Sequence, residues 1–207
     1  MAEGIKIEVY RNQSLDELTK KLADPGNRLG AGSAAAASAA VASGVLSLAA
    51  AGLAAGTEEK SEQLDWYVRN TEILRAYMVS LMDEDVKCHG PLRRAVKEGD
   101  ARRIEAARQT AVSICLEIVN MMGKCLEMAE GMLPFAEGET VSLLLESADL
   151  AYGASLAAGR HILSMSRQSP DDIYRYVMRR ENELTMQAQR AVYDRILAAE
   201  AKLELAL

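Results

Sequence analysis

Apolar residues recur at helical spacing along most of the chain, in one short segment followed by five long ones. A capping box, Ser14-Leu15-Asp16-Glu17, predicts the start of a short helix that ends before Pro25. The stretch before it, residues 5–10, is interpreted as strand-like or irregular. The long helical segments are predicted at about 31–56, 58–90, 100–131, 140–165 and from 169 onward.

Proline and glycine set the expected ends of these segments. Gly90-Pro91 is expected to interrupt the third helix, and Pro134 to end the fourth. Ser169-Pro170-Asp171-Asp172 predicts the start of the last helix, with Ser169 as the cap and the acids in the first turn. Helices of this length joined by short connections must run back alongside one another. We therefore expect an all-α fold, an elongated antiparallel bundle of about five to six helices forming a single domain over residues 1–207.

The segment 31–56 is the most unusual part of the chain, because its 26 residues carry no charge and half of them are alanine. A four-residue spacing of small residues predicts a ridge that lets neighbouring helices approach closely, as a central bundle helix requires. The ridge consists of Gly32, Ala36, Ala40, Gly44, Gly52 and Gly56.

A membrane span is the alternative for this segment, because its length is sufficient to cross a bilayer. Its composition argues against a span, since serine recurs in it and Glu58 and Glu59 follow where a basic flank is typical of an anchor. We expect a helix in the core of the bundle and no membrane partner.

Charge and cysteine content narrow the class of protein further. The net charge of −6 and the pI near 5.1 supply no broad positive field, so nucleic acid is not an expected partner. The three cysteines lie in helical patterns and favour reduced, buried thiols over a disulfide framework. The first residues lack the pattern of a signal peptide, which predicts a cytoplasmic location.

Two stretches carry candidate chemistry. Gly30-Ala31-Gly32-Ser33 precedes the alanine-rich helix and can offer backbone N–H groups to an anion. It is not a phosphate loop, because no Gly-Lys-Ser/Thr follows. The competing interpretation is a flexible glycine-containing helix start with no ligand.

The second stretch, residues 82–89, concentrates ionisable groups inside an apolar pattern. Asp85 and His89 share a helix face at four-residue spacing with Cys88 beside them, while Asp83 points elsewhere. A carboxylate and an imidazole held together can transfer protons near neutral pH. A solvated acidic turn is the alternative. No second ligand group stands at conventional spacing, so we expect no metal.

In order and spacing these motifs resemble the formiminotransferase-cyclodeaminase and methenyltetrahydrofolate cyclohydrolase family. The resemblance is carried by Ser14-Leu15-Asp16-Glu17-Leu18, by Pro25-Gly26 with Gly30-Ala31-Gly32-Ser33-Ala34-Ala35-Ala36, by Met82-Asp83-Glu84-Asp85, and by Pro170-Asp171-Asp172. It covers essentially the whole chain.

The resemblance implies a helical homodimer that binds a reduced folate near the glycine-rich turn. The expected reaction is ring opening of 5,10-methenyltetrahydrofolate by water, or its formation from the formimino derivative with loss of ammonia. Asp85, helped by His89, is the candidate for proton transfer, and Gly30, Gly32, Ser33 and Asp83 are the candidate ligand-binding residues.

The chain also departs from the family pattern. Residues 161–166 contain no asparagine, although the family carries asparagines in this segment. Relative to the family pattern, residues 27–29 are an insertion in the glycine-rich turn. A second hypothesis follows: a non-catalytic member that binds another small anionic ligand or a protein partner. A third is an assembly protein in which the alanine-rich helix serves dimer packing alone.

Overall fold

The structure of the chain, a computed structural model, describes residues 10–24, 26, 29–56 and 62–204, without the side chains of residues 89 and 202–204. Residues 5–9 of the expected strand-like start lie outside this range. The described part contains α1 (Leu15–Ala23), α2 (Ala31–Gly56), α3 (Glu62–Glu98), α4 (Ala101–Met132), a short 3₁₀ turn η1 (Leu133–Phe135), α5 (Glu139–Ser166) and α6 (Asp172–Glu204). No strand occurs within these ranges, and the expected all-α fold is confirmed.

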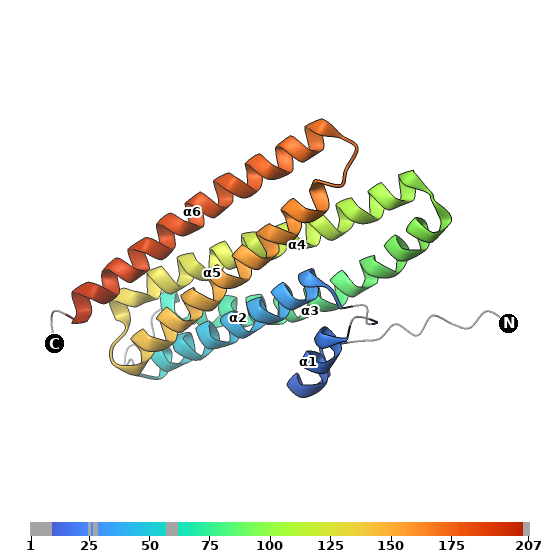
Figure 1. Cartoon of the computed structure of the whole chain (residues 1–207). Helices are drawn as coiled ribbons and strands as arrows, with labels where there is room; N and C mark the ends of the chain where they lie inside the picture. The colour runs from blue at the N-terminus through green and yellow to red at the C-terminus, as the bar shows by residue number, and fades with distance from the viewer. Residues whose placement is uncertain (1–9, 25, 27–28, 57–61, 205–207) are drawn as a thin grey trace.

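The five long helices form an elongated antiparallel bundle, with the short α1 set to one side (Figure 1). Helix α2 packs mainly between α3 and α5 and also touches α4, and α6 lies along α4 and α5. The Ser147 hydroxyl of α5 donates to the Ala42 carbonyl of α2 at 3.0 Å, and the Gln189 amide of α6 donates to the Val119 carbonyl of α4 at 2.6 Å. These contacts tie the outer helices to the inner ones.

The start of α1 is the capping box expected from the sequence. The Ser14 hydroxyl accepts from the Glu17 N–H, and the Glu17 carboxylate accepts from the Ser14 N–H at 3.0 Å. The helix ends at Ala23. Local chemistry is sufficient here, because both partners lie within one turn of each other.

The expected break at Gly90-Pro91 is wrong, because α3 continues through Pro91 to Glu98. Proline in a helix removes one hydrogen bond and costs roughly 3 kcal/mol, which packing can offset. Ala95, one turn beyond the proline, is buried. The chain reverses instead at Gly99, whose φ of +69° suits glycine, and Asp100 caps α4 by accepting from the Arg103 N–H at 3.0 Å.

The cap of the last helix also lies two residues later than expected. The carboxylate of Asp171, rather than the Ser169 hydroxyl, accepts from the N–H groups of Ile173 and Tyr174, at 2.9 and 3.0 Å. The Ser169 hydroxyl accepts from the Asp171 N–H at 3.2 Å and donates to Glu105 of α4 at 2.6 Å. Ser169 therefore shapes the turn before the helix and ties it to α4, while Asp171 caps the helix.

The four-residue ridge on α2 is only half buried. Gly32 and Ala36 face the core, whereas Gly52 and Gly56 are exposed. Four residues turn an α-helix by slightly more than one full turn, so a row at this spacing drifts around the helix. The buried stripe follows the true helical period and consists of Ala35, Ala36, Ala39, Ala42, Leu46, Ala49, Ala50 and Leu53.

By length and composition α2 is the one helix in the described ranges that could cross a membrane. In the structure 39% of its most apolar window is buried among the other helices. Its outer face leaves Val41 and Leu48 largely in solvent, at 55% and 60% exposure.

Candidate functional site

The start of α2 meets the middle of α3 at a buried carboxylate. The Ser33 hydroxyl donates to Asp85 Oδ2 at 2.6 Å, and both residues are almost completely buried. Ser33 belongs to the first turn of α2, and Asp85 lies 52 residues further along the chain. The structure thus brings together two of the residues that the sequence singled out separately.

Gly32 makes this approach possible. A Cβ atom placed on Gly32 would lie 2.2 Å from Asp85 Oδ1 and 2.7 Å from its Cγ. No side chain fits in that space, so the carboxylate occupies the place that any larger residue would fill. The glycine that the sequence marked as part of a ligand turn is therefore required for helix packing.

The position of Asp85 also favours the ionised form of its buried carboxyl group. Its carboxylate lies beside the first turn of α2, where backbone N–H groups have no helical acceptor and the helix dipole is positive. The Ser33 hydroxyl adds a charge-assisted hydrogen bond. The anion expected at this turn is thus supplied in the structure by the protein itself.

Asp83, two residues earlier on α3, faces a different part of the molecule. Its Oδ1 accepts from the backbone N–H of Tyr10 at 2.7 Å and from that of Arg11 at 3.3 Å. The Arg11 guanidinium lies 3.4 Å from its other oxygen. Asp83 therefore anchors the segment that precedes α1, and it does not join Ser33 and Asp85.

The remaining candidates border this pair. Gly30 is half-buried, and its carbonyl accepts the Ala34 N–H at 3.1 Å, which begins the hydrogen bonding of α2. The backbone of His89 lies in α3 one turn after Asp85, while its side chain is outside the described part. No group of three potential metal ligands occurs among the residues that the structure describes.

Two cysteines near Asp85 remain protonated at neutral pH. Burial, and then the charges of Asp85 and Glu84, raise the pKa of Cys88 to about 11. Burial, and then Asp85 and Cys88, raise the pKa of Cys115 on α4 to about 12. Both thiols are free, as expected, and neither is poised as a thiolate nucleophile. The sequence pattern gave no indication that Cys115 would lie here.

The fold and the site together define the class of protein. It is an antiparallel helical bundle in which the first turn of a helix of small residues packs on a buried carboxylate. A family model described as Formiminotransferase-cyclodeaminase matches residues 14–182. Since this match covers most of the chain, the protein belongs to the formiminotransferase-cyclodeaminase family, as the sequence motifs indicated.

A solved structure supports the assignment at the level of the fold. The chain is similar to the crystal structure of formiminotetrahydrofolate cyclodeaminase from Thermotoga maritima, with a TM-score of 0.85 and 19% sequence identity. The similarity covers 93% of this chain and 98% of that one. No curated protein matches the chain in sequence.

Proposed function

We propose that this protein is a folate one-carbon enzyme that acts on 5-formiminotetrahydrofolate or 5,10-methenyltetrahydrofolate. The single observation that supports this most is the Ser33–Asp85 pair, a buried carboxylate and hydroxyl at the start of the small-residue helix of a cyclodeaminase-like fold. The proposal includes no metal, because the formation and the collapse of the tetrahedral carbon need only a group that transfers protons.

Either reaction passes through a tetrahedral carbon between two nitrogens of the folate. Forming that carbon from the formimino group and expelling ammonia requires a group that takes up and returns a proton. Hydrolysis of the methenyl ring requires the same of a group that activates water. We assign this role to Asp85 with His89, one turn further along α3, as its partner.

Because Asp85 is fully buried in the structure, the substrate has to reach it through the first turn of α2. Gly32 packs directly against Asp85, so the proposal requires this turn to move away from α3 when the substrate binds and Gly30, Gly32 and Ser33 to contact the substrate there. The Ser33 hydroxyl is the group through which a proton can pass to the carboxylate. Asp83 supports the site indirectly, since it anchors the segment before α1 through Tyr10 and Arg11.

A spectrophotometric assay tests the proposal, because methenyltetrahydrofolate absorbs where the other forms do not. Purified protein is expected to convert the formimino substrate with release of ammonia, or to hydrolyse the methenyl form. Asp85→Asn should lower kcat by roughly 100-fold or more, the usual contribution of a general acid or base. Glu84→Gln is the matched control, because Glu84 is half-exposed and, among the described residues, forms its ion pair with Lys87, at 2.5 Å.

Two results would decide against catalysis. Turnover no faster than the uncatalysed reaction would favour the non-catalytic hypothesis, in which the chain binds another small anion or a protein partner. Equal losses in Asp85→Asn and Glu84→Gln would remove Asp85 from the proton-transfer role. A thermal shift with tetrahydrofolate separates binding from turnover, since a ligand of the folded state raises its stability.

We also infer a homodimer formed through the outer face of α2. Val41 and Leu48 are 55% and 60% exposed on a helix without charges. This face of α2 is therefore an exposed apolar surface that a second copy of the chain would bury. Leu48→Glu should shift the mass measured by light scattering to that of a monomer. Ile173→Glu, at a residue 76% exposed on α6, is the control and should leave the dimer intact. A monomeric wild-type protein would contradict the inference.

The domain and location expectations remain part of the same proposal. We treat the chain as one cyclodeaminase-like unit, because all five long helices share one core. Three free cysteines are consistent with a reducing compartment such as the cytoplasm.

A further inference from the structure

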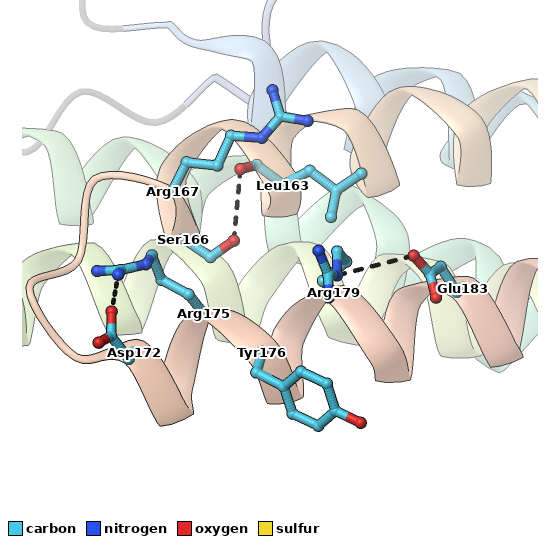
Figure 2. Close-up of a pocket in the computed structure, with 8 residues that line it drawn as sticks. All are labelled: Leu163, Ser166, Arg167, Asp172, Arg175, Tyr176, Arg179 and Glu183. Carbon is cyan, nitrogen blue, oxygen red and sulfur yellow. Dashed lines mark hydrogen bonds and ion pairs between the residues drawn. The ribbon is translucent and has the colours of Figure 1, made fainter.

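A cavity between the end of α5 and the start of α6 concentrates positive charge (Figure 2). Its volume is about 450 Å³, and three arginines line it, Arg167, Arg175 and Arg179, together with Asp172 and Glu183. The lining therefore carries one net positive formal charge in a chain whose net charge is −6. Neither Ser33 nor Asp85 takes part in it.

The three guanidinium groups differ in how firmly they are held. Arg175 donates to the Ser169 carbonyl at 2.5 Å and pairs with Asp172, which fixes its side chain at the cavity. The Arg179 Nε lies 3.9 Å from the Glu183 carboxylate, at the limit of an ion pair. None of the residues that the structure describes forms an ion pair with Arg167. One cation is thus pre-oriented, and two are available to a ligand.

All three arginines line the cavity, but their cationic groups point in different directions, and the Arg167 guanidinium points away from α6 in Figure 2. Arg175 and Arg179 are four residues apart on α6 and so share one face, whereas Arg167 follows the last residue of α5 (Figure 2). Ser166, which is buried, lies between them in the view of Figure 2. Two N–H groups in the first turn of α6, those of Ile173 and Tyr174, are occupied by the Asp171 carboxylate, so the arginines are the main source of positive charge at the cavity.

Guanidinium groups recognise carboxylates and phosphates through paired hydrogen bonds, and two of them on separate segments, one after the end of α5 and one on α6, suit a ligand with two separate anionic groups. We propose that this cavity binds a small anion that carries at least two carboxylate or phosphate groups. Arg167 and Arg179 contact the ligand, and Arg175 is held in place by Asp172 to complete the site. Binding displaces Glu183 from Arg179.

Isothermal titration of the full-length protein with inorganic pyrophosphate and, separately, with tricarballylate tests the site. We expect binding that weakens as sodium chloride is added, because charge carries the affinity. Arg167→Gln and Arg179→Gln should each lower the affinity roughly tenfold, as the loss of a charge-assisted hydrogen bond predicts. The ratio of the two affinities shows whether phosphate or carboxylate is preferred.

Two further variants make the outcome decisive. Arg180→Gln is the matched control, because Arg180 also lies near Glu183, at 3.6 Å, but does not line the cavity, so its affinity should stay within about twofold of wild type. Glu183→Gln removes the competing carboxylate and should raise the affinity about two- to fivefold. Absence of binding by both anions at millimolar concentration, or an equal loss in Arg180→Gln and Arg179→Gln, would overturn the proposal. Circular dichroism melting of each variant confirms that it is folded.

Discussion

Replacing Gly32 by alanine tests the packing on which the candidate site depends. The new methyl carbon would lie 2.2 Å from Asp85 Oδ1, so α2 and the carboxylate must separate by roughly 1 Å. Overpacking of this kind costs about 1–3 kcal/mol. Weakening the hydrogen bond between Ser33 and the buried carboxylate adds about 1.5–3 kcal/mol.

The intrinsic preference of alanine for a helix offsets about 1 kcal/mol of this cost. The free energy of unfolding of Gly32→Ala should therefore fall by about 1.5–5 kcal/mol, which for a chain of this size corresponds to a loss of about 3–20 °C in Tm. Urea unfolding followed by circular dichroism, at one fixed protein concentration, measures the difference.

Gly153→Ala is the matched control on α5, because nothing lies within 4 Å of a Cβ built there. It should be neutral or stabilise the protein by up to about 1 kcal/mol. In an Asp85→Ala background the clash disappears, so Gly32→Ala should lose most of its cost, a coupling that a double-mutant cycle detects. If Gly32→Ala is as well tolerated as Gly153→Ala, the close packing of α2 on Asp85 is refuted.

Three further changes test other parts of the structure. Ser33→Ala removes the hydroxyl that donates to Asp85 and should cost about 1.5–3 kcal/mol in urea unfolding, whereas Ser33→Thr, which keeps a hydroxyl, should cost less. Burial alone would raise the pKa of Glu105, but its hydrogen bonds from Ser169 and from side chains on its own helix lower the pKa overall. The stability that Glu105 contributes should therefore be present above its ordinary pKa of 4.5 and be lost as pH falls through the lowered pKa. The free energies of unfolding of the wild type and of Glu105→Gln should then converge as the pH is lowered, and a difference that stays constant with pH would contradict this. Gly131→Ala places a Cβ 2.3 Å from the Tyr67 hydroxyl and should lower Tm by several degrees. Because the clash involves that hydroxyl, adding Tyr67→Phe should restore most of the lost Tm, and no recovery in the double variant would contradict this reasoning.

Local sequence was sufficient for features whose causes lie within a few residues. The capping box at Ser14 acts within one turn, and the helical period of the apolar positions is set by neighbours three or four residues apart. The uncharged stretch 31–56 forms one helix, as its composition predicted. The family resemblance rests on the same ordered motifs. It predicted the all-α bundle and the family, because pattern and spacing persist even where identity to the solved relative is only 19%.

Tertiary contacts decided the details of the site. No local rule places Asp85 against Ser33 across 52 residues, leaves Asp83 to anchor Tyr10, or carries α3 through Pro91 to Glu98. Periodicity states which face of a helix is apolar, but it does not state which residue of another helix meets it. The sequence by itself therefore determined the helices, their class and, through the family resemblance, one site that holds both Ser33 and Asp85. Only the packed structure determined that the carboxylate of α3 fills the glycine-marked start of α2 directly.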